Sequence, residues 1–404
     1  MDRRRFLTTS AVATSAVLAR GLLPVHTFAR PAAQTRFERG ADLFPLLDVS
    51  GSYFEIGKAV GKTFGASIKK GLGRRKSWFA NLWEYANSLE GMKHVSAMHK
   101  AAETHTPHVV QELRGWARGA KISYRKLFVL NIKSELLALQ NKTEKNPDGC
   151  STVAYRDDNK LLLAHNEDGN KAYNGLMFML RVTPRNGPTA LVFTYPGTIE
   201  GNAAWMNEHG VFMSTNYIAS KVVTPGVPRY FLSRKAMEAR TVQEAVEIVS
   251  HPQRAYGYHQ FIGSVPEHQL ISLEANPEKV STFQVDGLYY HTNHLRHDTM
   301  KDRPQFQDYM DRSSKPRLES LKTDLENASA RKGDKTSIME ALSSHKSKPT
   351  PVCRHAKGDN EGMTFANVLM ESAGKNSPKA MHLTHGPPCE GVRKAYRVKG
   401  TTGS

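Results

Sequence analysis

The sequence predicts a protein of the α+β class, with antiparallel sheet held between layers of helix. From Tyr53 to about Leu139, apolar residues recur at spacings of three and four, which is typical of amphipathic helices. After residue 150, short apolar and β-branched runs alternate with turn sequences, which is typical of antiparallel hairpins. Further helical patterns follow among the later strands, so we expect the sheet to be covered by helices.

Ile56, Val60 and Phe64 fall on one face of a helix, because side chains at spacings of three and four lie on the same side.

The helical part is expected to end in a polar loop. Residues 141–149 read Asn-Lys-Thr-Glu-Lys-Asn-Pro-Asp-Gly, with few apolar side chains to bury and several residues that favour turns. We therefore expect a loop there.

The strand-rich part is expected to begin directly after this loop and to contain further helices. Thr241 and Glu244 predict a capping box at the start of one helix, which ends near Val249. A stretch rich in Lys and Arg, residues 300–348, combines a helical pattern with charge, and we expect a solvated, charged insertion. Strands return from residue 364 to residue 383. The other predicted strands cover residues 152–155, 160–165, 177–182, 189–195, 210–215, 269–274 and 287–290.

The first residues are typical of an export signal. Three arginines at positions 3 to 5 precede Phe6 and a modest apolar stretch over residues 11–23, which is a twin-arginine pattern. This stretch is shorter than the roughly 20 apolar residues that a membrane span needs. We expect residues 1–29 to be a twin-arginine signal peptide and the mature chain to be periplasmic or secreted. A basic, disordered arm is the alternative.

The chain carries a large positive charge. It has 56 Lys and Arg against 38 Asp and Glu, a formal net charge of +18. These residues are scattered, and no basic stripe interleaved with aromatic residues argues for nucleic acid. We expect no nucleic-acid partner, no integral membrane segment in the mature chain, and a loose attraction to an anionic envelope.

Three cysteines, Cys150, Cys353 and Cys389, are too few for a framework of several disulfides. Cys353 and Cys389 are able to pair and leave Cys150 free, but the sequence leaves that pairing open. No Cys-x-x-Cys or His-Glu-x-x-His motif occurs, so no metal and no cofactor are expected.

The Gly149-Cys150 junction, where the loop meets the first strand, suggests a specific chemistry. A thiol there can attack the preceding carbonyl and move the acyl group from nitrogen to sulfur, and hydrolysis then leaves Cys150 as a new N-terminus. Gly149 tolerates strained backbone geometry because it lacks Cβ. The freed α-amino group, with a pKa near ~8, can serve as the base for its own thiol. The plain alternative is a buried cysteine that acts as a small hydrophobic residue.

An acidic residue is expected close to this junction. After the first predicted hairpin comes His165-Asn166-Glu167-Asp168, at the end of an apolar strand. A carboxylate at that point is able to reach back to the first strand, where Asp168 would orient the Cys150 amine. The alternative is a turn aspartate before Gly169.

Several motifs, in their order and spacing, resemble the penicillin acyltransferase-like family of Ntn hydrolases, whose type is acyl-CoA:6-aminopenicillanic acid acyltransferase. Bile-salt hydrolases and acid ceramidases are more distant members of the same group. The likeness covers most of residues 45–392. Its motifs are Glu55-Ile56-Gly57 with Gly61, Gly149-Cys150-Ser151-Thr152, Asn166-Glu167-Asp168, Asn207-Glu208-His209-Gly210-Val211, His291-Thr292-Asn293-His294, Cys353-Arg354-His355 and Gly386-Pro387-Pro388-Cys389.

The resemblance implies a four-layer αββα sandwich and a self-processing amide hydrolase or acyltransferase that acts on small-molecule amide or acyl substrates. Cleavage after Gly149 would give fragments 30–149 and 150–404 that stay associated. Cys150 would be the nucleophile, Asp168 would fix its amine, and Asn293 would stabilise the oxyanion with its amide. Asn216 matches a second asparagine position of related enzymes.

The chain departs from the family pattern at two points. His165 stands before Asn166, where bile-salt hydrolases and ceramidases carry a nearby arginine, and residues 360–362 supply no arginine before the strand that starts at Thr364. Two other functions stay open. One is a conventional thiol hydrolase without self-cleavage that uses His165 or His294, and the other is a non-catalytic envelope-binding protein on the same fold.

Overall fold

The computed structural model describes residues 33–40, 43–143, 149–326, 328–347, 350–356, 362–374, 377 and 379–399. The predicted signal peptide and most of the predicted loop before Cys150 lie outside these residues. Within them, no helix combines the length and the apolar character that crossing a membrane requires.

A nine-stranded sheet carries the first helical layer. Its strand order is β1-β2-β5-β6-β7-β8-β9-β10-β11, and all neighbours are antiparallel except β2 and β5. The strands are β1 (Gln34–Glu38), β2 (Leu46–Gly51), β5 (Phe178–Pro184), β6 (Ala190–Thr194), β7 (Ala204–Asn207), β8 (Val211–Tyr217), β9 (Tyr258–Ser264), β10 (Gln269–Ala275) and β11 (Val280–Gln284). The helices are α1 (Tyr53–Arg74), α2 (Lys76–Asn87), α3 (Leu89–His105), α4 (Pro107–Ala120), α5 (Tyr124–Asn131), α6 (Lys133–Leu139), α7 (Arg229–Ala236) and α8 (Val242–Val249).

A six-stranded antiparallel sheet carries the second helical layer. Its order is β12-β3-β4-β13-β14-β15. The strands are β3 (Ser151–Arg156), β4 (Leu161–Asn170), β12 (Gly287–His291), β13 (Gly362–Ser372), β14 (Ala380–His385) and β15 (Val392–Arg397). The helices are α9 (Gln307–Tyr309), which continues into a π-helical turn (Met310–Ser314), then α10 (Lys315–Leu325), α11 (Ala328–Arg331) and α12 (Lys335–Leu342).

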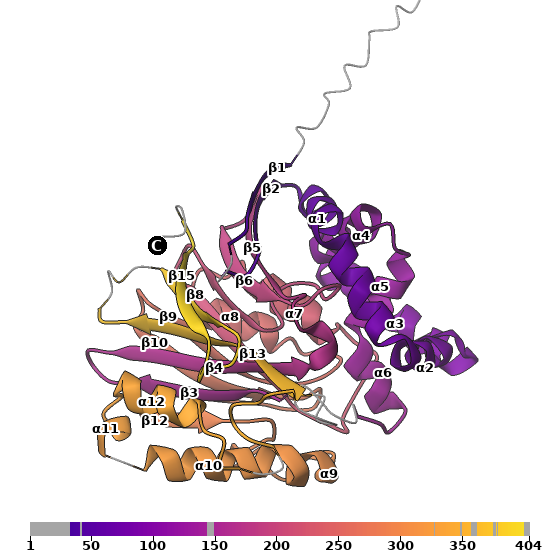
Figure 1. Ribbon diagram of the computed structural model, residues 1–404. Helices are drawn as coiled ribbons and strands as arrows, with labels where there is room; N and C mark the ends of the chain where they lie inside the picture. Colours follow the sequence, from indigo (N-terminus) through magenta and orange to yellow (C-terminus); the bar gives the residue numbers. More distant parts are fainter. Residues whose placement is uncertain are drawn as a thin grey trace, which may run out of the picture. The chain divides into compact units, whose positions relative to one another are not determined.

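Figure 1 shows the four layers, and three clusters of buried apolar side chains lie between them. Successive side chains of a strand point to opposite faces, so Leu180 of β5 joins the cluster under the first helical layer and Met179 joins the cluster between the sheets. Leu162 of β4 belongs to the third cluster, beneath α10 and α12. The predicted α+β class and the αββα order are therefore confirmed.

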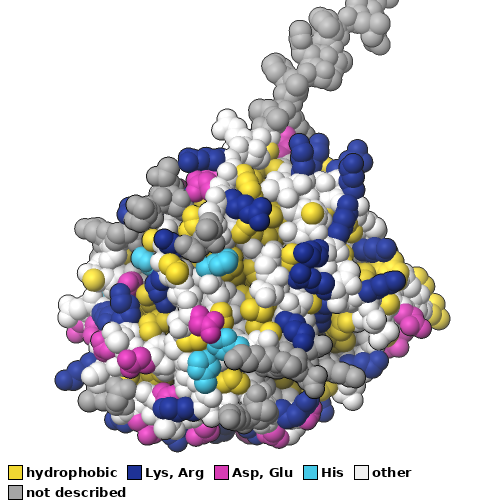
Figure 2. All heavy atoms as spheres, in the orientation of Figure 1, with side chains coloured by type: hydrophobic (Ala, Val, Ile, Leu, Met, Phe, Trp, Pro, Cys, Tyr) yellow, Lys and Arg dark blue, Asp and Glu magenta, His cyan; other side chains and the backbone are white. Residues whose placement is uncertain are grey.

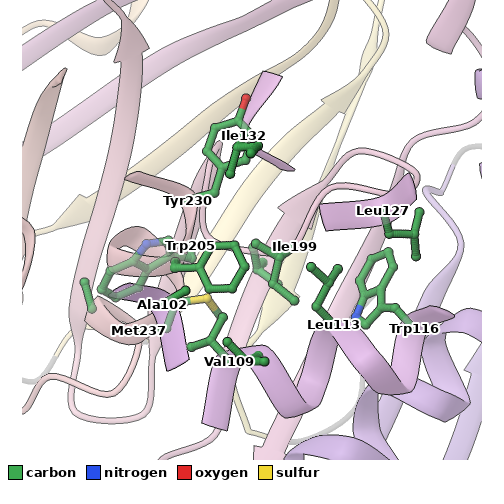
Figure 3. Close-up of a cluster of buried hydrophobic side chains, with 14 of the residues drawn as sticks. Ala102, Val109, Leu113, Trp116, Leu127, Ile132, Ile199, Trp205, Tyr230 and Met237 are labelled. Carbon is green, nitrogen blue, oxygen red and sulfur yellow. The ribbon is translucent and has the colours of Figure 1, made fainter. Parts of the chain in front are cut away.

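The close approach of α1 and α4 depends on glycines. Gly57 and Gly61 stand one turn apart on α1 and face Gly115 and Gly119 on α4. A Cβ built on Gly57 would overlap the carbonyl oxygen of Glu112, and the other three glycines meet backbone in the same way. Without Cβ atoms the two backbones come into contact, and the larger apolar side chains of α4 are directed to the sheet. Figure 3 shows Leu113 of α4 beside Ile199, and Trp116 of α4 beside Leu127.

The segment 300–348 is not the solvated insertion that its charge suggested, and that expectation is wrong. Its helices form the second helical layer, and Leu321, Leu325, Ile338 and Leu342 are buried against the six-stranded sheet. These positions recur at a spacing of four and so share one helix face, while most of the charged residues, Arg317 excepted, lie on the outer face. On the face of the molecule that Figure 2 shows, Lys and Arg side chains are densest over α1 to α6, with uncharged side chains between them.

Candidate active site

Cys150 stands directly before β3 and is 3% exposed. In the β3–β4 hairpin, Ser151 pairs with Asn166 and Thr152 pairs with His165. Because antiparallel partners run in opposite directions, the next residues of β4, Glu167 and Asp168, extend past the start of β3 toward Cys150. The carboxylate that the sequence predicted beside the junction is therefore there.

Burial raises the pKa of the Cys150 thiol well above its usual value, and the charges of Glu167 and Asp168 raise it further. The Asp168 backbone N–H and the Arg317 guanidinium lower this pKa by smaller amounts. The thiol is therefore protonated at neutral pH in the intact chain, and it needs a base before it can attack a carbonyl.

Asp168 is fully buried within β4, so the alternative of a turn aspartate is wrong. Its Oδ1 accepts a hydrogen bond of 2.6 Å from the Thr364 hydroxyl, and its Oδ2 lies 3.9 Å from Nη1 of Arg354. Burial raises the pKa of this carboxyl to about 6, against the opposing charges of Arg354 and Arg317. At neutral pH the carboxylate is ionised and able to accept a proton.

Asn293 follows β12 and is joined to the Cys150 backbone through Arg317. Its Oδ1 accepts a 2.6 Å hydrogen bond from Nη2 of Arg317, and Nη1 of the same guanidinium donates to the Cys150 carbonyl oxygen at 2.6 Å. The Asn293 amide nitrogen, Nδ2, donates to the carbonyl oxygen of Tyr217 at 2.9 Å. One of its two N–H groups is thus engaged by backbone.

Asn216 lies on β8, in the facing sheet, and is fully buried. Its Oδ1 accepts a 3.0 Å hydrogen bond from the Thr152 hydroxyl, two residues beyond Cys150. Its Nδ2 has no hydrogen-bond partner among the described residues. A buried amide N–H group without a hydrogen-bond acceptor lowers the stability of the fold, unless another group accepts from it.

His165 and Glu167 form a second polar group at the thiol. Nε2 of His165 is 3.0 Å from Oε2 of Glu167, and Nδ1 of His165 is 2.7 Å from the Thr152 hydroxyl. The Cys150 sulfur, one His165 nitrogen and one Glu167 oxygen lie within 4.8 Å of one another. His294, the other candidate base, instead contacts the Ser314 hydroxyl with its Nδ1 at 2.7 Å.

Two arginines that sequence reasoning did not assign flank Gly149. A Cβ on Gly149 would lie 2.9 Å from Nη2 of Arg317 and 3.1 Å from Nη1 of Arg354. Arg317 precedes Leu321 by four residues, which puts it on the buried face of α10 and was the only signal for it. Both guanidinium groups are buried, so they bring positive charge to the Gly149–Cys150 bond.

Arg354 lies beside the strand that contains Thr364, although residues 360–362 supply no arginine. The Arg354 N–H donates to the Thr364 hydroxyl at 2.9 Å, and the Thr364 N–H donates to the Arg354 carbonyl oxygen at 3.0 Å. An arginine therefore does accompany this strand, supplied by the Cys353-Arg354-His355 motif.

A cavity of about 40 Å³ adjoins Cys150, with Glu167, Tyr195, Tyr217 and Arg229 among its lining. This volume accepts groups the size of water. Among the described residues, the free space beside the thiol is therefore small.

The model of the acyl-coenzyme A:6-aminopenicillanic acid acyl-transferase family matches residues 155–381. Beta-alanyl-dopamine/carcinine hydrolase of Drosophila melanogaster is 27% identical over 219 residues, which are 51% of this chain and 57% of that protein. The chain thus spans little more than half the length of this relative.

Two solved structures show a weaker likeness. A variant of conjugated bile acid hydrolase from Clostridium perfringens has 12% identity and a TM-score of 0.40, with 63% of this chain and 99% of that chain covered. Penicillin V acylase from Agrobacterium tumefaciens has 11% identity and a TM-score of 0.35, with 61% and 86% covered. The family match itself extends over more than half of the sequence, and the chain belongs to the acyl-coenzyme A:6-aminopenicillanic acid acyl-transferase family.

Proposed function

We propose that this chain is an amide hydrolase or acyltransferase that cleaves its own Gly149–Cys150 bond and then acts through a thioester at the new N-terminal Cys150. The observation that carries the proposal is the position of the buried thiol. It stands at the start of β3, with the Asp168 carboxylate beside it and two guanidinium groups against Gly149. Membership of the family supports the same class of reaction.

In the cleavage step, the Cys150 thiol gives its proton to the Asp168 carboxylate, and the sulfur attacks the carbonyl carbon of Gly149. Negative charge then develops on the carbonyl oxygen, where Arg317 and Arg354 supply positive charge in a site with little water. The C–N bond breaks as nitrogen takes the proton back, which leaves a thioester. Water hydrolyses the thioester to a Gly149 carboxylate and a free Cys150 with its amine.

In turnover, the Cys150 α-amino group removes the thiol proton, because its pKa near ~8 suits a base at neutral pH. The sulfur attacks the substrate amide carbonyl, and the amine passes the proton to the leaving nitrogen. Asp168 orients the amine. Asn216 and Asn293 donate to the oxyanion, and the Asn216 Nδ2, which has no partner among the described residues, is the better placed of the two. Water or a second amine then resolves the thioester.

The substrate class that we propose is a small-molecule amide. The Drosophila relative is named as a hydrolase of beta-alanyl-dopamine and carcinine, which supports the class without naming a substrate for this chain. The two fragments are expected to stay together, because β2 from the first pairs with β5 from the second and α1 packs on the same sheet. Export through the twin-arginine signal remains part of the proposal.

The test is the intact mass and the N-terminal sequence of the purified protein. We expect two fragments of about 13 and about 28 kDa, the larger one starting at Cys150, and a single uncleaved chain for Cys150→Ala. The N-terminus of the smaller fragment reports whether residues 1–29 have been removed. Normal cleavage of Cys150→Ala would contradict self-processing.

The conventional thiol mechanism gives a different result. It predicts an active single chain that loses activity in His165→Gln, because His165 is the histidine that lies beside the thiol. The non-catalytic alternative predicts a cysteine that forms no acyl adduct. We expect His165→Gln to be cleaved, and incubation of the mature protein with an activated acyl donor to add one acyl group at Cys150.

A further inference from the structure

Four side chains from distant parts of the sequence converge at the surface beyond the active site. They are His345, which follows α12, Cys353 and His355 in the segment before β13, and Cys389 in the turn after β14. One donor atom of each lies within 4.8 Å of those of the other three. Cys353 is buried, His355 is half-buried, and His345 and Cys389 are exposed.

Four of the six distances between these atoms are close to the edges of a tetrahedron around a metal ion. The two sulfurs are 3.4 Å apart, and the two Nε2 atoms are 3.1 Å apart. Nε2 of His355 lies 3.2 Å from the Cys389 sulfur and 3.8 Å from the Cys353 sulfur. Tetrahedral zinc, with Zn–S near ~2.3 Å and Zn–N near ~2.0 Å, gives edges of roughly 3.3 to 3.8 Å.

The kind of donor indicates zinc. Two thiolates and two imidazoles form a soft to borderline set, which favours zinc over magnesium or calcium. Among the described residues, Oε1 of Glu390 stands 3.7 Å from Nδ1 of His355, the nitrogen that points away from the sulfurs. Carboxylates commonly occupy this place behind a metal-bound histidine, where they fix the tautomer and the ring orientation.

We propose that His345, Cys353, His355 and Cys389 bind one Zn²⁺ ion in a structural site. Four protein donors fill the tetrahedron and leave no position for a substrate, so the ion serves the fold and takes no part in the reaction. It joins the end of α12 to the segment before β13 and to the turn after β14. The backbone of Cys353 already contacts the residues that follow α12, because its N–H donates to the Ser344 carbonyl oxygen at 2.9 Å.

The site also has a consequence for Asp168. Arg354 stands between the two ligands Cys353 and His355, and its Nη1 lies 3.9 Å from Oδ2 of Asp168. Metal binding at its two neighbours fixes the backbone of Arg354. The ion thus positions the arginine that contacts the carboxyl group of the active site.

The experiment measures the zinc content of the full-length chain, purified without a histidine tag from zinc-supplemented cells. We expect about one zinc ion per chain, and at least a tenfold loss in Cys389→Ser and in His355→Gln. Two matched controls, Cys150→Ser and His94→Gln, change a cysteine and a histidine outside the four residues and should keep the zinc. Cys150→Ser also tests the Cys150, His165 and Glu167 group, because zinc bound there would be lost in this variant instead.

Thiol chemistry on the wild-type chain provides a second readout that does not depend on how the variants fold. We expect Cys353 and Cys389 to resist alkylation until a chelator is added, and stoichiometric zinc to restore the protection. An intact mass lower by two hydrogens would show a Cys353–Cys389 disulfide and would overturn the proposal. A zinc-free chain with freely alkylated thiols would do the same. Cleavage after Gly149 is scored separately on the same sample, so either proposal can fail alone.

Discussion

The guanidinium of Arg317 donates a hydrogen bond of 2.6 Å to the carbonyl oxygen of Cys150. The same guanidinium holds the Asn293 side chain at 2.6 Å. A single buried cation from the second helical layer thus connects the proposed nucleophile with a proposed oxyanion donor. The second helical layer, which we expected from the sequence to be a solvated insertion, therefore contributes a side chain to the proposed active site.

Arg317→Gln should slow self-cleavage. The substitution keeps an amide that can donate to backbone but removes positive charge from beside Gly149, and the loss of one oxyanion donor costs about 100-fold in comparable sites. The time course of the uncleaved chain, followed by intact mass, gives the rate. Arg312→Gln is the control, because Arg312 is exposed and pairs with Asp308 on the outer face. Cleavage of Arg317→Gln at the wild-type rate would remove Arg317 from the mechanism.

Gly149→Ala should also accumulate uncleaved chain. The added methyl group would stand 2.9 Å from Nη2 of Arg317 and 3.1 Å from Nη1 of Arg354. Hydrogen bonds to Cys150, Ser151 and Asn293 hold Arg317 in place, so we expect the junction to shift away from the charges. We expect at least a tenfold slower cleavage, measured by the same mass assay. Gly73→Ala, in a helix where nothing lies within 4 Å, is the matched control and should cleave normally. Equal cleavage rates for the two variants would show that the guanidinium groups move aside without any effect on cleavage.

The part of the site that lies on the β3–β4 hairpin could be predicted from the sequence. Cys150 and Asp168 come from one hairpin, and the length of its two strands fixes which residues face each other. Arg317 and Asn216 belong to a helix of the second layer and a strand of the facing sheet, and no short-range pattern marks such contacts. The proposed zinc ligands were not predicted for the same reason, because the spacing of positions 345, 353, 355 and 389 does not match a known zinc-binding motif.

Two of the strands that the sequence did not predict, β9 and β11, were missed for different reasons. β9 contains His259 and Gln260, polar residues that are buried with polar partners: His259 contacts Asn216 of the neighbouring strand β8, and Gln260 contacts Ser233 of α7. β11 is largely exposed and lies at the edge of its sheet, so its alternation is weak. Periodicity finds strands with an apolar face. It does not find those that are buried through polar partners or left at an edge.

The stability of the uncleaved chain should depend on pH through Asp168. The pKa of this carboxyl rises from 3.8 to about 6 on folding, mainly because the group is buried. Between these values the folded state binds more protons than the unfolded state, so the contribution of Asp168 to stability falls as pH rises and levels off above about pH 6. The shift corresponds to about 3 kcal/mol.

Denaturation of Cys150→Ala and of Cys150→Ala with Asp168→Asn, between about pH 3 and pH 7, measures this contribution. Asparagine has no proton to lose and stays neutral, so the stability of the double variant relative to the single variant should improve by about 3 kcal/mol as pH rises across this range. A constant difference would show that Asp168 keeps an ordinary pKa in the folded chain.

Arg234→Met should destabilise the fold strongly, because Arg234 is buried among three carboxylates. Its side chain contacts Glu112 at 2.8 Å, Glu238 at 3.3 Å and Glu200 at 3.4 Å, and it joins α7 to α4. Removal of the cation leaves Glu112 and Glu200 buried without their partner, which costs about 3–5 kcal/mol in comparable cases. The exposed Arg240→Met is the control, with an expected change near zero. Urea denaturation gives both values. A loss below about 1 kcal/mol for Arg234→Met would mean that the carboxyl groups take up protons when the arginine is absent, as the raised pKa of Glu112 allows.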